Sequence, residues 1–260
     1  MSKVYRVCPV FIFFAGVYLL KNHKNYDKII NIEFYQKRIL ERINTTTMER
    51  RFFKVSSQKN PLITINAAPG HFATGSSHIS HYIDISALKS SASVAKNAAR
   101  ELAVPYLTNT LVNVIIYMEG TEIIAAYLAD ELLQAGPGVI NDGGEIYVIT
   151  PISSSTGHFI FHENVQEKIF NKNILLIVAS TSTGATINRA VECLAYYGGR
   201  LVGISAIFSA IPEIEGWKVH SLFTCDDIPA YKFYKPFECE MCEKGRKLDA
   251  IINSEGYTKI

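Results

Sequence analysis

Hydrophobic residues in this chain follow two spacings after about residue 60, short apolar runs and longer runs with helical periodicity. Short β-branched runs predict strands, and runs that repeat an apolar residue every three or four positions predict helices. Ser91–Val104, for example, places its apolar residues on one helical face, and Pro105 ends the segment. We expect strands at 111–117, 145–150, 173–178, 201–208 and 219–224, helices at 91–104, 121–133 and 186–197, strand and loop over 62–84, and a polar loop over 151–157.

The order of these segments predicts the fold class. Strands that alternate with helices of about 12 residues are typical of a parallel sheet covered by helices on both faces. We find no internal repeat or low-complexity tract, so residues 48–260 are interpreted as one α/β domain.

The first 47 residues differ from this body. Val7–Leu20 is an almost unbroken apolar run that lies between basic residues. The run is shorter than the roughly 20 residues of a membrane-spanning helix, and no convincing signal-peptide cleavage site follows it. Three interpretations remain open: translation starting at Met48, a membrane anchor, or a helix that packs on the body or a partner.

Composition limits the partners. The chain has 26 Lys and Arg against 24 Asp and Glu, a formal net charge of +2, which gives no basic footprint for nucleic acid. An anionic ligand would therefore be bound by a local arrangement of groups. The five cysteines are odd in number and unevenly spaced, which argues against a secreted disulfide framework and favours a reducing, cytoplasmic location.

The segment Ile174–Thr186 carries the most specific chemistry. A buried strand leads into a loop of small hydroxyl residues with one glycine, and a helix begins directly afterwards. Such a loop directs backbone N–H groups and the positive end of a helix toward one point, where a phosphate can bind without a lysine. An ordinary strand-to-helix turn with capping hydroxyls would explain the segment alone equally well.

The surrounding sequence favours the phosphate interpretation. Ile174–Thr186 resembles the phosphoribosyl-pyrophosphate signature of type I phosphoribosyltransferases, and Gly70–Asp84 is similar to the substrate-side hood of orotate phosphoribosyltransferase. The resemblance covers about 210 residues and implies a parallel sheet flanked by helices with a small hood from N-terminal and C-terminal segments. It also assigns residues to three groups: phosphate-binding Thr181, Ser182, Thr183, Gly184, Ala185 and Thr186; a pyrophosphate loop of Glu119, Gly120 and Thr121; and base-side hood residues Phe72, His78 and Tyr82.

The chain departs from this family where charge is expected. The two acids of the signature fall at Val178 and Ala179. The loop Pro151–His162 has no Lys or Arg and leaves only His158 and His162 as candidates, and a hood lysine of the family is replaced near His78. Fewer charges should weaken the binding of pyrophosphate and the stabilisation of its developing charge.

Two functional hypotheses follow from the resemblance. The first is transfer of phosphoribose from phosphoribosyl pyrophosphate to a pyrimidine-type base in nucleotide metabolism. The second is a catalytically inactive regulatory protein that binds a nucleotide or ribose phosphate on the same fold. The resemblance assigns no catalytic residue, and it implies a homodimer and allows Mg²⁺.

Possible metal ligands occur elsewhere in the chain. Cys239 and Cys242 form a Cys-x-x-Cys pair, but their spacing from Cys225 and His220 fits no common zinc site. His71, His78 and His81 would permit a triple-histidine metal site, although histidines at the substrate edge or the surface explain them better. We therefore expect no zinc and interpret the thiols as buried or loosely paired.

Overall fold

The computed structural model describes residues 51–260 except 135, 137, 155, 156 and 255. The described residues belong to one compact unit, Arg51–Ile260. The three interpretations of residues 1–47 fall outside the described part and stay predictions. None of the helices in the described part is long and apolar enough to cross a membrane.

A six-stranded sheet forms the centre of this unit, in the order β10-β11-β9-β8-β4-β5. All neighbouring strands are parallel except the short edge pair β10 and β11. The strands are β4 (Val114–Tyr117), β5 (Tyr147–Ile149), β8 (Asn173–Thr181), β9 (Arg200–Ser209), β10 (Glu213–Ile214) and β11 (Trp217–Thr224).

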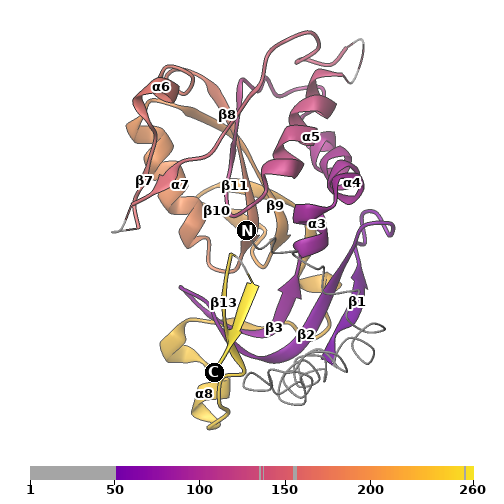
Figure 1. The fold of residues 1–260 in the computed structure, drawn as a ribbon, viewed down its shortest axis with the longest axis vertical. Helices are drawn as coiled ribbons and strands as arrows, with labels where there is room; N and C mark the ends of the chain where they lie inside the picture. The colour runs from indigo at the N-terminus through magenta and orange to yellow at the C-terminus, as the bar shows by residue number, and fades with distance from the viewer. Residues whose placement is uncertain (1–50, 135, 137, 155–156, 255) are drawn as a thin grey trace, which may run out of the picture. The chain divides into compact units, whose positions relative to one another are not determined.

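Helices cover both faces of this sheet, as Figure 1 shows. Side chains alternate along β8, so Leu175 and Ile177 pack with α4 (Ala92–Ala103) and α5 (Glu122–Leu133). Ile174, Leu176 and Val178 pack on the opposite face with α7 (Ala185–Tyr196). Burial on both faces explains why β8 is a continuous apolar run.

The strand order creates a switch point between β4 and β8. Counted along the chain, the five parallel strands take the order 2-1-3-4-5, with β5 on one side of β4 and β8 on the other. The helix after β4 packs on one face and the helix after β8 on the other. The chain therefore diverges at the carboxyl ends of β4 and β8, which is where open α/β sheets bind ligands.

A second six-stranded sheet, which we call the hood, combines the start and the end of the described chain (Figure 1). Its strands run in the order β12-β3-β2-β13-β14, and β1 pairs with β2. β2 and β3 form an antiparallel hairpin whose register shifts between Pro69 and Phe72. The strands are β1 (Phe53–Ser56), β2 (Thr64–Ala73), β3 (His78–Asp84), β12 (Phe233–Tyr234), β13 (Ala250–Asn253) and β14 (Gly256–Lys259).

The predicted fold class is confirmed: an α/β protein with a parallel sheet flanked by helices. The three predicted helices and five predicted core strands all occur, with ends shifted by a few residues. The expected polar loop at 151–157 instead contributes to a small hairpin, because Ile152–Ser153 pairs with Phe159–Ile160. The remaining elements are α3 (Ser86–Ser90), η4 (Val104–Tyr106), β6 (Ile152–Ser153), β7 (Phe159–Ile160), α6 (Glu163–Gln166), η5 (Cys225–Asp227), η6 (Pro236–Glu238) and α8 (Glu240–Glu243).

Candidate functional site

A cavity of about 720 Å³ lies at the carboxyl ends of β4 and β8 and is bounded by the hood. The core contributes the end of β8, the first turns of α7 and Glu119, the second residue after β4. The hood contributes the β2–β3 turn, the end of β3 and the β13–β14 strands. The described lining comprises residues 74–77, 82–86, 89–90, 119, 179–186, 189, 252–254 and 256.

The turn between β8 and α7 forms the core side of this cavity, and we call residues 181–186 the cradle. Gly184 adopts a left-handed conformation (φ +80°), which a residue without Cβ reaches without strain. Its N–H donates to the Thr181 hydroxyl over 3.1 Å. Because the first N–H groups of α7 have no intrahelical acceptor, the cradle directs donors and the positive helix end into the cavity.

All six residues predicted to bind phosphate line the cavity. Their hydroxyls differ in surroundings. Thr181 is buried and supports the turn, whereas the Thr183 hydroxyl lies 3.4 Å from that of Ser76 in the hood. The Ser182 hydroxyl bonds the phenol of Tyr231, whose pKa is raised above its ordinary value mainly by burial.

Glu119 is the lining residue that the pyrophosphate loop contributes. It follows β4 in a left-handed conformation (φ 58°), and Gly120 continues it (φ 75°). Its carboxyl accepts hydrogen bonds from the backbone of Ser180 and Ala179 and from the Thr186 hydroxyl. Burial raises the pKa of Glu119, although these hydrogen bonds and the nearby Lys89 oppose the rise. A carboxyl group therefore lies against the end of β8, where the signature acids are missing.

The rest of the pyrophosphate loop is placed differently. Thr121 is buried, and its hydroxyl donates to the Met118 carbonyl over 2.8 Å. Gly120 packs against Lys89, whose Nζ would lie 2.8 Å from a Cβ at that position. Neither residue lines the cavity, so they shape the turn that holds Glu119.

The cavity lining includes two cationic side chains that the sequence did not indicate. Lys89 donates to the Ser254 carbonyl over 2.8 Å, and it extends from α3 toward the end of the hood. Arg189 follows the cradle on α7 and donates to the Gly157 carbonyl over 3.2 Å. Their positions depend on tertiary packing, so no local pattern indicates them.

The three predicted base-side residues separate in the structure. Tyr82 lines the cavity, and burial raises the pKa of its phenol to about 12, with Asp84 and Tyr257 adding to the rise. Phe72 is fully buried within the hood, and His78 Nδ1 lies 3.3 Å from the Cys242 sulfur, so neither residue lines the cavity. The base-side role expected for Phe72 and His78 therefore stays a prediction.

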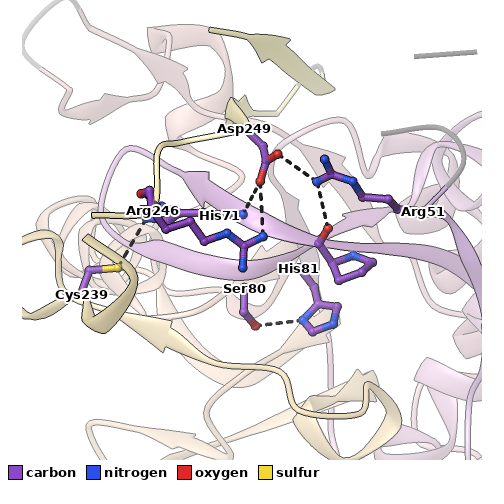
Figure 2. Close-up of polar contacts among 8 residues, drawn as sticks. Arg51, His71, Ser80, His81, Cys239, Arg246 and Asp249 are labelled. Atoms are coloured by element: carbon purple, nitrogen blue, oxygen red, sulfur yellow. Dashed lines mark hydrogen bonds and ion pairs between the residues drawn. The ribbon is translucent and has the colours of Figure 1, made fainter. Parts of the chain in front are cut away.

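The metal ligands considered from the sequence also separate. His220 packs edge-on against Tyr106, and the Cys225 thiol lies 3.6 Å from the Ala210 carbonyl. Cys239 and Cys242 are instead beside His71 and His78. His81 is outside this group, with its ring 2.9 Å from the Ser80 hydroxyl (Figure 2).

Comparisons with known proteins give structural likeness at low identity. No protein-family model matches the chain, and no curated protein sequence matches it. It is similar to the orotate phosphoribosyltransferase of Mycobacterium tuberculosis, with 16% identity and a TM-score of 0.43 over 62% of this chain and 93% of that one. A phosphoribosyltransferase from Corynebacterium diphtheriae shows 17% identity and a TM-score of 0.42 over 61% and 90%.

An adenine phosphoribosyltransferase from Rhodothermus marinus is similar over 68% of this chain and 96% of its own, with 13% identity and a TM-score of 0.42. These solved structures are phosphoribosyltransferases, the class of protein that the sequence also resembles. These likenesses concern the backbone, and at such TM-scores the function has to be inferred from the cavity itself.

Proposed function

We propose that this chain binds a phosphoribosyl ligand, phosphoribosyl pyrophosphate or a nucleotide, with its 5′-phosphate in the cradle. The observation that supports this most strongly is the position of the cradle. It combines a left-handed Gly184, the N-terminus of a 12-residue helix and a switch point of the sheet, and it opens into a cavity of about 720 Å³. A phosphate needs convergent N–H donors and positive potential, and this geometry supplies both.

The cavity also suits the rest of such a ligand. Its volume falls within the roughly 300–1,000 Å³ of small-molecule sites. Lys89 and Arg189 add positive charge around it, while Tyr82 supplies an aromatic surface on the hood side. We infer that the phosphate lies on the core side and the base on the hood side.

Phosphoribosyl transfer to a pyrimidine-type base is a second candidate function, and Glu119 favours it. In this reaction a ring nitrogen attacks C1 of the ribose, and pyrophosphate leaves through an oxocarbenium-like state. The family places acids near the ribose at the positions of Val178 and Ala179. The Glu119 carboxyl, held by the backbone of Ala179 and Ser180, would replace one of them.

The cavity offers few protein ligands for the Mg²⁺ ion that phosphoribosyl transfer would use. The ion usually takes one or two carboxylates together with phosphate oxygens of the substrate. Among the described lining residues, Glu119 and Asp84 carry carboxyl groups, and Asp84 accepts from the Ser86 N–H over 3.0 Å. Glu119 is therefore the residue that would hold Mg²⁺, which would offset the charge of the leaving pyrophosphate.

Calorimetric titration of the full chain tests the binding proposal, with ribose 5-phosphate, phosphoribosyl pyrophosphate, uridine monophosphate and orotate as separate probes. We expect the three phosphorylated probes to bind and to compete with one another. Failure of all three to bind would contradict the proposal. Turnover assays with phosphoribosyl pyrophosphate, orotate and Mg²⁺ then separate the two functions, because a regulatory protein would bind without releasing pyrophosphate.

Replacing Glu119 sharpens that separation. If Glu119 replaces a signature acid, Glu119→Gln abolishes pyrophosphate release while nucleotide binding persists. Asp130→Asn is a control on the same side of the core sheet, because Asp130 is an α5 carboxylate outside the cavity lining. Equal turnover in wild type and Glu119→Gln would mean that Glu119 does not replace a signature acid, and its position would no longer support transfer.

We propose in addition a cytoplasmic homodimer. The described cysteines are free thiols, which suits a reducing compartment. The dimer is implied by the resemblance to orotate phosphoribosyltransferases, and light scattering during size-exclusion chromatography would give twice the 29.0 kDa chain mass if it forms.

A further inference from the structure

Four metal-ligating side chains converge where the β2–β3 hairpin meets α8, and we call them the His-Cys cluster. They are His71 on β2, His78 on β3, Cys239 at the start of α8 and Cys242 within α8. Their ligand atoms all lie within 4.8 Å of one another. The register shift between Pro69 and Phe72 falls at His71, and such irregularities redirect side chains.

Four of the six distances between these ligand atoms match the edges of a tetrahedral zinc site. Zinc bonds of about 2.0–2.1 Å to nitrogen and about 2.3 Å to sulfur place the two nitrogens about 3.3 Å apart and each nitrogen about 3.6 Å from sulfur. His71 Nε2 and His78 Nδ1 are 3.2 Å apart. The nitrogen–sulfur distances are 3.5 Å and 3.6 Å from His71 to Cys239 and Cys242, and 3.3 Å from His78 to Cys242.

The orientation of His71 also suits a metal ligand. Its Nδ1 lies 2.8 Å from the Arg246 carbonyl, which fixes the proton on Nδ1 and leaves one lone pair on Nε2. His78 Nδ1 and the two cysteine sulfurs all approach that single lone pair. One lone pair cannot accept a hydrogen bond from all three atoms at once. A shared cation among the four ligand atoms explains the convergence.

The backbone around His71 is held in place by charged groups, as Figure 2 shows. Asp249 accepts from the His71 N–H over 2.8 Å and from Arg51 over 2.9 Å, while its own N–H donates to the His71 carbonyl over 2.7 Å. Arg246 lies 3.7 Å from the same carboxylate. The strand that carries His71 is thus fixed to the chain segment after α8.

Burial is uneven across the cluster. His71 and Cys239 are 0% and 1% exposed, whereas Cys242 is exposed. A buried imidazole and a buried thiol hold the inner half, and an ion can enter from the Cys242 side. Two histidines and two cysteines with no open position are the ligand set of structural zinc sites.

We propose that His71, His78, Cys239 and Cys242 bind one Zn²⁺ ion that fixes the C-terminal segment to the β2–β3 hairpin. This replaces the expectation of no zinc, which considered Cys225 and His220 as partners of the cysteine pair. The turn between His71 and His78 includes residues 74–77, which line the cavity. The ion therefore stabilises the hood on which the ligand cavity depends.

Metal analysis of the full chain, expressed with zinc and purified with a thiol reductant, tests this proposal. We expect about one zinc ion per chain, and less than about 0.2 in Cys242→Ser and in His78→Ala, since a four-ligand site loses closure with any ligand. Cys225→Ser is the matched control, because Cys225 is a partly exposed cysteine outside the cluster. It should keep the wild-type zinc content.

Cobalt provides a second readout that reports the ligands directly. Co²⁺ added to the metal-free full chain should give the intense visible bands of tetrahedral coordination and a thiolate-to-cobalt charge-transfer band in wild type and Cys225→Ser. Wild-type protein with less than about 0.2 zinc per chain and no such bands would overturn the proposal. A Cys239–Cys242 disulfide found by mass spectrometry in the reductant-purified protein would overturn it as well.

Discussion

The cradle and the His-Cys cluster are both built around a turn, but they are assembled in opposite ways. The cradle consists of six consecutive residues, 181–186, whose geometry follows from a strand that leads into a helix. The cluster combines a hairpin near residue 75 with a helical turn near residue 240, and 171 positions separate His71 from Cys242. A locally encoded site can be recognised from its sequence, whereas a site assembled by the fold depends on knowing which distant segments meet.

The largest effect on the cradle should come from Gly184→Ala. The new Cβ would lie 2.0 Å from Ile214 Cδ1, and the residue would keep a left-handed backbone. Overpacking of about 1–3 kcal/mol and conformational strain of about 1–2 kcal/mol should reduce the free energy of unfolding. We expect ribose 5-phosphate affinity to fall by about 100-fold because the turn must move, as measured by calorimetry.

Gly216→Ala is the matched control for this change. Gly216 has nearly the same backbone conformation (φ +81°), and an added Cβ there meets nothing within 4 Å. Its free energy of unfolding, measured with urea, should fall only by the conformational strain. Its affinity for ribose 5-phosphate should stay at the wild-type value. Equal loss of affinity in both variants would mean that the cradle has no special part in binding.

The second largest effect should come from removing zinc from the His-Cys cluster. Chelation of zinc from the wild-type chain should lower Tm by several degrees, since the ion links segments far apart in sequence. Ribose 5-phosphate affinity should change less than about tenfold, because the cradle donors belong to the core sheet and α7. Thermal unfolding and calorimetry with and without chelator measure both, and the Cys242→Ser variant should not respond to the chelator.

Glu119→Gln should have a smaller, pH-dependent effect on the cradle. The raised pKa of Glu119 means that its protonated form favours the folded state below its ordinary pKa, and this contribution is lost as pH rises through the raised pKa. The Gln variant should therefore have the wild-type free energy of unfolding at acidic pH. Above the raised pKa of Glu119 it should be more stable than wild type. Phosphate affinity at neutral pH should rise at least about tenfold, because removing one like charge roughly 12 Å away is worth about 1.4 kcal/mol at an effective dielectric constant of about 20.

Urea unfolding at a series of pH values, in wild type and Glu119→Gln, checks the direction. A stability difference that does not change with pH would show that Glu119 is not the titrating group. Asp130→Asn, outside the cavity, should keep the wild-type profile.

The smallest effect should come from Ser76→Ala, which tests whether the two regions are coupled. The hydroxyls of Ser76 and Thr183 connect the hood turn to the cradle over 3.4 Å, a long and exposed hydrogen bond. Such a bond contributes about 0.5–1 kcal/mol at most, so affinity for ribose 5-phosphate should fall no more than about fivefold. A larger loss in calorimetry would mean that the hood sets the geometry of the cradle.

The same contrast explains what could be predicted from the sequence. The periodic segment 91–104 and the continuous apolar run 173–178 indicated a core helix and a core strand, because burial on one or both faces imposes a pattern on the sequence. The cradle was recognisable for the same local reason. The C-terminal elements after residue 225 were not predicted, since β12, β13 and α8 have two to four residues and little periodicity.

Lys89, Arg189 and the position of Glu119 were beyond local reasoning as well. Lys89 reaches the cavity from a five-residue helix, and Glu119 reaches the end of β8 through two successive left-handed residues. His78 was assigned to the base side because its neighbours resemble a hood, and the fold placed it beside Cys242. Each of these positions is set by contacts between segments far apart in sequence.

The most direct test of the central claim is a titration of the isotope-labelled full chain with ribose 5-phosphate, followed by amide NMR. If the cradle binds the 5′-phosphate, the largest and saturable shift changes will occur at the amides of residues 182–186. Changes elsewhere, with these amides unmoved at saturation, would contradict the phosphate-binding account of this protein.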